Sequence, residues 1–159
     1  MVTNILLGIG NPLNGDDGAG IYVAEQFRKD GWISLSCGTA PENFTGMIRK
    51  AQPDCLVLVD AATMGLFPGE YRVIPRHRIA DVSIGTHQIP LSMLIDFLSD
   101  SAGQIVLIGI QPGLVAAGEE ISPQIREGAN RLVHELLSGR INRIPVLELK
   151  ITNDSIRVK

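Results

Sequence analysis

Short, continuously apolar runs alternate with amphipathic stretches along this chain of 159 residues. The run 55–59 is apolar throughout, which is typical of a central strand that is buried on both faces. In the stretch 42–52, apolar side chains recur at the i, i+3, i+4 and i+7 spacing of a helix. The same reasoning predicts further strands at 4–8, 33–37, 70–74 and 105–110, and further helices at 18–29, around 91–98, and between Ser122 and Gly139.

This order of elements predicts one domain, 1–159, with an α/β fold. Strands that alternate with helices favour a three-layer α/β/α sandwich around a mostly parallel, five-stranded sheet. The stretch 70–74 alternates polar and apolar residues and follows the turn signal Pro68-Gly69, so we expect it to be the one antiparallel strand, at a sheet edge. The segment 140–159 also alternates, and is expected either to add an edge strand or to lie loosely on the surface.

Composition and charge narrow the possible partners. The net charge of −3 gives no electrostatic argument for binding nucleic acid or an anionic membrane. No apolar run approaches the roughly 20 residues of a membrane-spanning helix. The chain enters a strand at once, without the pattern of a signal peptide, so we expect a cytoplasmic protein. Cys37 and Cys55 have neither metal-ligand nor disulfide spacing, and are interpreted as small buried apolar residues.

The glycine-rich loop 8–20 is the most informative segment for chemistry. It joins a predicted strand to a predicted helix, the place where open α/β sheets put their binding sites. The loop carries two adjacent carboxylates, Asp16 and Asp17, where a nucleotide-binding loop would cradle a phosphate. Negative charge at this position favours a cation, so the loop points toward a metal or another positive centre.

Two further polar residues also lie where a predicted strand ends or a predicted helix begins. Asp60 ends the buried run that begins at 55, and His87 lies just before the helix around 91–98. Neighbouring strand ends meet at one crevice of a doubly wound sheet, so we expect both to lie near Asp17. Two carboxylates and one imidazole suit a divalent transition metal and leave coordination positions open.

Each of these residues also has a purely structural interpretation. Asp60 can cap the turn that follows its strand, and Asp16 and Asp17 can both cap the first helix, whose dipole favours negative charge. A single histidine before a helix, such as His87, is commonly structural or solvated. It is the combination of three residues at three separate transitions between elements that favours a site.

Several other catalytic patterns are missing from the sequence. The glycines at 8 and 10 are not followed by the third glycine of a dinucleotide-binding fingerprint, and there is no phosphate-binding loop lysine. Neither a His-Glu-x-x-His zinc motif nor a Gly-x-Ser-x-Gly nucleophile elbow is present.

The motifs that remain resemble those of the [NiFe]-hydrogenase maturation endopeptidases, in particular the hydrogenase-3 type. The resemblance runs in order from about residue 6 to residue 137, and five segments carry it: 8–20, 37–43, 58–65 with 68–70, 86–91 and 109–112. It implies a mixed five-stranded sheet between helices, of the phosphorylase/hydrolase-like kind. It also implies an activity: removal of the C-terminal extension of the hydrogenase large-subunit precursor once nickel has been inserted.

The resemblance further implies roles for individual residues. The metal-contacting positions of the family match Asp17, Asp60 and His87, and Asp16 is the alternative to Asp17. The metal is nickel supplied by the substrate, so no tightly bound resident cofactor is expected. Either the nickel polarises the scissile carbonyl or activates a water, or a carboxylate, Asp17 or Asp16, acts as general base. The implied partner is the large-subunit precursor; a monomer is expected, with no nucleic acid and no membrane.

Two other functions remain open from the sequence. One is a nickel-dependent, chaperone-like module that binds the precursor without cutting it. The other is a metal-dependent hydrolase of small molecules, because related α/β/α folds carry such activities. That function needs anion donors in a closed pocket, and the chain offers few basic residues near the predicted crevice.

Overall fold

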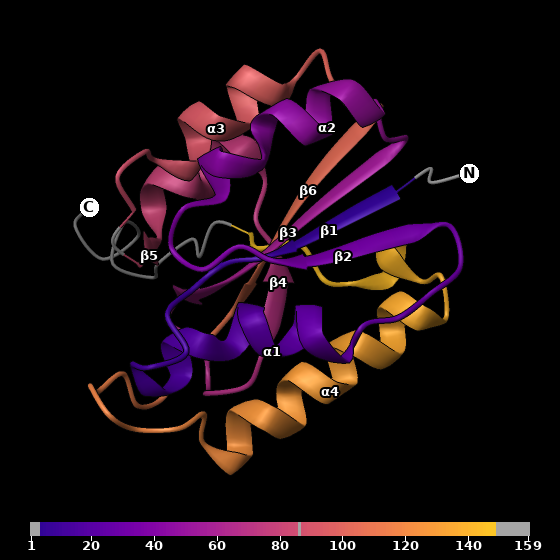
Figure 1. The fold of residues 1–159 in the computed structure, drawn as a ribbon. Helices are drawn as coiled ribbons and strands as arrows, with labels where there is room; N and C mark the ends of the chain where they lie inside the picture. Colours follow the sequence, from indigo (N-terminus) through magenta and orange to yellow (C-terminus); the bar gives the residue numbers. More distant parts are fainter. Residues whose placement is uncertain (1–3, 86, 149–159) are drawn as a thin grey trace, which may run out of the picture.

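A mixed six-stranded sheet forms the centre of the molecule (Figure 1), as seen in a computed structural model that describes residues 4–85 and 87–148. Five strands follow the order β2-β1-β3-β6-β4, and the short β5 pairs with the end of β3. β4 runs antiparallel to β6 and β5 antiparallel to β3, while the other pairs are parallel. The strands are β1 (Asn4–Gly8), β2 (Trp32–Ser36), β3 (Cys55–Thr63), β4 (Tyr71–Val73), β5 (Ser83–Ile84) and β6 (Gln104–Ile110).

Helices cover both faces of the sheet, which confirms the predicted three-layer sandwich (Figure 1). α1 (Ala19–Gln26) and α4 (Pro123–Leu137) pack together on one face, and α2 (Thr45–Ala51) and α3 (Leu91–Leu98) lie on the other. Within the described ranges, no helix is long and apolar enough to cross a membrane. Four short 3₁₀ turns complete the elements: Gly15–Gly18, Pro41–Phe44, Arg76–Asp81 and Ile141–Arg143.

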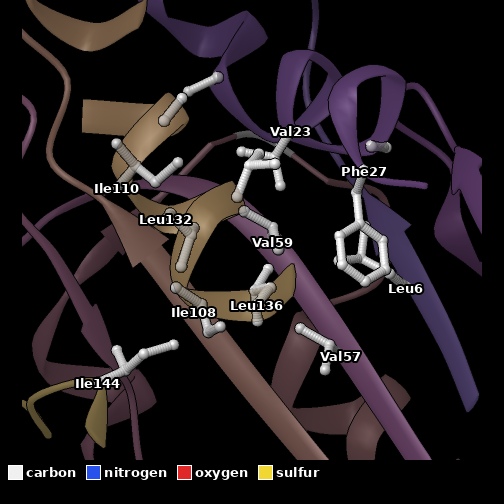
Figure 2. Packing of buried hydrophobic residues seen from close by; sticks show 14 of the residues in the cluster. Leu6, Val23, Phe27, Val57, Val59, Ile108, Ile110, Leu132, Leu136 and Ile144 are labelled. Carbon is white, nitrogen blue, oxygen red and sulfur yellow. The ribbon is translucent and has the colours of Figure 1, made fainter. Parts of the chain in front are cut away.

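The two-residue period of the strands divides the core into two halves. Val57 and Val59 of β3 face α1 and α4, where Figure 2 shows Val59 among the side chains of Leu132 and Val23. The alternate residues Leu56 and Leu58 belong to the second cluster, against α2 and α3. This alternation puts the next even-numbered residue, Asp60, on the α2/α3 side of the sheet.

The place of Asp60 differs from the prediction. The sequence predicted that Asp60 is the last residue of the buried strand, whereas β3 continues to Thr63. Partners on the neighbouring elements explain the extension, because β6 pairs with β3 up to Ala61 and β5 pairs with its last two residues. β1 ends with Gly8 opposite Val59, so Asp60 is the first β3 residue beyond the end of β1.

This point is also where the chain reverses its direction of winding. From β1 the chain goes outward to β2 on one side, and then returns to β3 on the other side of β1. The connecting helices α1 and α2 lie on opposite faces of the sheet (Figure 1). In open α/β sheets, a reversal of this kind leaves the binding crevice outside the carboxyl ends of the two strands where it occurs, here β1 and β3. The fold therefore places Asp60 at the edge of the sheet's natural binding crevice.

Other boundaries moved by a few residues. The helix predicted at 18–29 ends at Gln26, because the buried Phe27 adopts an extended backbone and packs edge-to-face on Trp32. The helix predicted at 42–52 begins with a 3₁₀ turn and is α-helical only from Thr45. The tail prediction is tested only in part: Val146 forms a parallel bridge with Val73 of β4, while 149–159 lie outside the described residues.

The cysteines fit their predicted role only in part. Cys37 is buried, and burial raises the pKa of its thiol to about 12. Cys55 is half-buried, and burial raises its pKa as well. Both are free, and a raised pKa keeps a thiol in its unreactive protonated form.

Candidate active site

The loop after β1 folds back so tightly that only glycine fits at two of its positions. Gly10 has a φ of 144°, and a Cβ there would lie 2.1 Å from the main-chain oxygen of Asp17. A Cβ on Gly20 would lie 2.2 Å from the main-chain oxygen of Val59, so α1 starts directly against β3. These close approaches bring the turn Gly15–Gly18 over the crevice between β1 and β3.

Asp60 and His87 form a buried pair at this crevice. Nε2 of His87 lies 2.7 Å from Oδ2 of Asp60, and the two side chains are 5% and 1% exposed. The second oxygen of Asp60, Oδ1, and the second ring nitrogen of His87, Nδ1, have no hydrogen-bond partner among the described residues. Buried polar atoms are nearly always hydrogen-bonded, so two orphaned atoms on adjacent side chains indicate a site built for something that is added.

The surroundings raise the pKa of both groups. Burial raises the pKa of Asp60 to about 6, against the lowering effect of His87, and the negative charge of Asp17 raises it further. The hydrogen bond that Nε2–H of His87 donates to the Asp60 carboxylate is the main cause that raises the pKa of His87, and burial opposes it. The charge of Asp17 and the Thr39 main chain also raise the pKa of His87, although Nδ1 lacks a hydrogen bond of ordinary geometry. A crevice with such perturbed groups is a candidate for proton transfer or cation binding.

Asp17 completes this group from the side of α1. Its side chain is half-buried, and its Oδ2 accepts a 3.3 Å hydrogen bond from the main-chain N–H of Asn11. A Cβ on Gly85 would lie 3.0 Å from Oδ1 of Asp17, so this carboxylate lies against the segment that leads to His87. The structure thus brings the three predicted side chains from three elements to one place.

The proximity of these side chains does not amount to a formed metal site. Among the described residues, no group of three or more His, Cys, Asp and Glu side chains has the arrangement of a metal site. The pairing of Asp60 with His87 occupies Nε2, the ring nitrogen that points at the carboxylate. The ligand set Asp17, Asp60 and His87 therefore stays a prediction.

Asp16 has a different environment from its neighbour. Its side chain is fully buried, and its carboxylate accepts hydrogen bonds from three main-chain N–H groups: Gly113 at 2.9 Å, Leu114 at 2.6 Å and Ser122 at 2.7 Å. The expectation that Asp16 caps the first helix is wrong, because no side-chain hydrogen bond caps either the 3₁₀ turn or α1. Since both oxygens of Asp16 are taken up by the distant segment 113–122, the geometry favours Asp17 as the group that faces a substrate.

The sequence reasoning missed one buried polar residue beside the crevice. Gln111 follows β6, and its Oε1 accepts hydrogen bonds from the N–H groups of Met64, at 2.7 Å, and Leu66, at 3.3 Å. It thereby fixes the loop after β3. Two signals in the sequence pointed to it: Gln111 is a polar residue directly after a buried strand, and it lies in the segment 109–112 that carries part of the family resemblance. No role of its own was assigned to it, because Pro112-Gly113 marks a turn there.

Comparisons with known proteins agree with this fold. Residues 22–139 match the model of the HycI family, described as hydrogenase maturation protease. The hydrogenase 3 maturation protease of Escherichia coli strain K12 is 39% identical over 142 residues, which cover 87% of this chain and 90% of that protein. The solution structure of the endopeptidase HycI from Escherichia coli has 34% identity and a TM-score of 0.84, and the match covers 95% of this chain and all of that chain. The crystal structure of a [NiFe] hydrogenase maturation protease HycI from Thermococcus kodakarensis KOD1 has 34% identity and a TM-score of 0.77, over 86% of this chain and 91% of that one.

Proposed function

Because this chain belongs to the hydrogenase maturation protease family, we propose that it is the endopeptidase that removes the C-terminal extension of a [NiFe]-hydrogenase large-subunit precursor after nickel insertion. Its relatives are named as a maturation protease and an endopeptidase, so the general activity is that of a peptidase. The family relationship favours this activity over the small-molecule hydrolase and over the binding module that does not cut. The proposal goes beyond this general activity in three respects: which peptide bond is cut, which protein is the substrate, and that nickel is required.

One observation carries the proposal. At the crevice between β1 and β3, the buried carboxylate of Asp60 is paired with His87 and lies beside the half-buried Asp17, and its Oδ1 has no hydrogen-bond partner within 4–85 and 87–148. Burying an ionised carboxylate with too few partners is costly, so a cation entering here would be bound more favourably than at an ordinary surface carboxylate. A nickel ion carried by the precursor fits this need, since imidazole and carboxylate are both acceptable nickel ligands.

In this proposal the substrate's nickel positions the precursor. Asp17 and Asp60 contribute oxygens, and His87 contributes a ring nitrogen after its hydrogen bond to Asp60 is exchanged for the metal. Three protein ligands leave positions for groups of the precursor, so the ion can be held by both proteins at once. Such docking fixes the scissile peptide next to the carboxylates, and correct placement alone accounts for a large part of a typical rate enhancement.

Two routes lead from this complex to cleavage. In the first, the nickel polarises the scissile carbonyl or activates the attacking water. In the second, an aspartate accepts the proton of that water, as in aspartic-type hydrolysis. Asp17 is the more accessible base, because its side chain is half-buried whereas both oxygens of Asp16 already accept main-chain hydrogen bonds. The chain is proposed to act as a monomer in the cytoplasm, without a resident metal.

The test compares nickel-loaded and nickel-free precursor after incubation with the protein, by intact mass. We expect loss of one C-terminal peptide from the loaded form alone, and cleavage at least about 100-fold slower with Asp17→Asn or His87→Ala, the scale of lost acid–base or metal-assisted catalysis. Asp96→Asn is the matched control, because the carboxylate of Asp96 is exposed and forms its ion pair with Arg76, away from the three candidate site residues.

Each alternative outcome has a definite meaning. Cleavage of both precursor forms at the same rate would show that the protein is a peptidase that does not require nickel in its substrate. A nickel-dependent complex without any mass change would replace the endopeptidase with the binding module.

A further inference from the structure

Large apolar side chains stand exposed on two loops that adjoin Asp17. Leu13 is 72% exposed in the loop after β1, and Leu114 and Val115 are 52% and 55% exposed in the loop after β6. Main-chain hydrogen bonds join these loops, from the N–H of Gly118 to the carbonyl of Leu13, at 2.8 Å, and from the N–H of Asp16 to the carbonyl of Leu114, at 2.7 Å. We call the apolar surface of Leu13, Leu114 and Val115 the docking lip.

The buried carboxylate of Asp16 holds this lip in place. It accepts hydrogen bonds from the main-chain N–H groups of Gly113, Leu114 and Ser122, which lie about a hundred positions further along the chain. Hydrogen bonds to a charged acceptor are the strong ones, and three of them on one carboxylate fix the loop's main chain at both ends. A loop fixed in this way presents its apolar side chains to solvent without the freedom to turn them inward.

The same 3₁₀ turn, Gly15–Gly18, carries both the residue that holds the lip and the candidate catalytic residue. Asp16 points to the loop after β6, while its neighbour Asp17 lies at the crevice with His87. One peptide unit joins Asp16 to Asp17, so the lip lies next to the candidate catalytic residue. Exposed apolar groups beside a protease site have a natural occupant, since an endopeptidase must hold its polypeptide substrate on both sides of the bond that it cuts.

We propose that Asp16 is a positioning residue that fixes the docking lip, and that the lip binds an apolar part of the large-subunit precursor next to its scissile bond. This inference rests on the proposed function for the identity of the occupant. It gives Asp16 a role through the loop that it holds, and gives Leu13, Leu114 and Val115 a role in substrate affinity.

The first test separates binding from chemistry. With Leu114→Ser/Val115→Ser, the KM for nickel-loaded precursor and the Kd of the complex are expected to rise at least about tenfold, with kcat within about twofold of the wild type. Met93→Ser/Leu137→Ser is the matched control: it removes two apolar side chains that are 59% and 40% exposed on α3 and α4, and should leave both constants unchanged. Unchanged KM and Kd in the lip variant would overturn the proposal, as would a change of oligomeric state in light scattering, because the lip would then bind a second copy.

The second test asks whether Asp16 acts through the lip. Asp16→Asn is expected to raise KM and Kd as much as the lip variant does, and to speed up amide exchange at Leu114 and Ser122. Combining Asp16→Asn with the lip substitutions should raise KM by no more than a further twofold, because both changes remove the same interaction. If the KM of the combined variant instead rose by the product of the two separate increases, Asp16 would act independently of the lip.

The binding measurement also separates this inference from the proposed function. A precursor that binds in a lip-dependent way but is not cut would support the lip and overturn the cleavage. A precursor that is cut equally well by the wild type and the lip variant would support the proposed cleavage and overturn the role of the lip. A precursor that neither binds nor is cut would overturn both proposals.

Discussion

Asp16, in the 3₁₀ turn after β1, and Asp60, within β3, are two buried carboxylates whose surroundings are opposite. Asp16 accepts three main-chain hydrogen bonds, so its burial costs little and stabilises a loop. Asp60 has His87 as its side-chain partner, and its Oδ1 finds no partner in the part of the chain that the structure describes; burial raises its pKa to about 6. A buried acid with its hydrogen bonds made serves the fold, whereas one with a missing partner is ready to take up a proton or a cation.

The largest difference between the two sites should appear in stability. Asp16→Asn removes the charge that three N–H groups share and points an amide at them, so the free energy of unfolding should fall by about 2–4 kcal/mol. Asp60→Asn removes a poorly solvated charge, so at about pH 8 its free energy of unfolding should stay within about 1 kcal/mol of the wild type or rise. Urea unfolding of both variants, with chelator present, measures the contrast. Equal losses would mean that the two carboxylates play the same structural part.

A second contrast lies in the dependence of stability on pH. Between its ordinary pKa of 3.8 and the raised value of about 6, the folded chain holds a proton on Asp60 that the unfolded chain has lost, so this stabilisation disappears as the pH rises through about 6. The raised pKa of His87 acts with the same sign, since its contribution is present below 6.5 and is lost as the pH rises through the folded value. From about pH 4.5 to about pH 7, the wild type should lose about 2 kcal/mol relative to Asp60→Asn.

Unfolding curves of both proteins across this range provide the measurement. The difference between the two proteins isolates the pair from the other titrating groups of the chain. A wild type that gains stability relative to Asp60→Asn as the pH rises would contradict the raised pKa.

The smallest expected effect tests how closely Asp17 is held at the crevice. Gly85→Ala would put a Cβ 3.0 Å from Oδ1 of Asp17, so the carboxylate must shift by a few tenths of an ångström. We expect kcat/KM for precursor cleavage to fall about tenfold, equivalent to about 1.4 kcal/mol, with little change in stability. Gly46→Ala in α2 is the control, because nothing lies within 4 Å of its added methyl group and alanine favours the helix. Equal activity of both variants would show that Asp17 is free to move without cost.

Elements of the fold could be predicted from the sequence where their pattern lies within a few neighbouring residues. The run at 55–59 and the helical spacing at 42–52 are properties of neighbouring residues, so the order of layers and the antiparallel β4 were predicted correctly. The short β5 has no pattern of its own, since its two residues are strand only because the end of β3 lies beside them. The extension of β3 beyond Asp60, to Thr63, was missed for the same reason.

In the candidate site, too, some features could be predicted from the sequence and others depend on tertiary contacts. The strand-end rule was enough to bring Asp17, Asp60 and His87 to one crevice, since a reversal of winding can be inferred from the order of elements. It could not distinguish Asp16 from Asp17, which are neighbours of identical chemistry. Their roles separate only because one side chain meets the main chain of 113–122 and the other meets the segment before His87.

By itself, the sequence determined the α/β/α layers, the crevice at the end of β1 and the residue types that gather there, because hydrophobic periodicity and glycine-rich turns act over a few residues. Only the tertiary structure decided which carboxylate is satisfied and which is left short of partners. Hydrogen bonds such as the one from Ser122 to Asp16 join residues 106 positions apart, and no local pattern encodes them. Burial, which raises the pKa of Asp60, is likewise a property of the packed whole rather than of any stretch of chain.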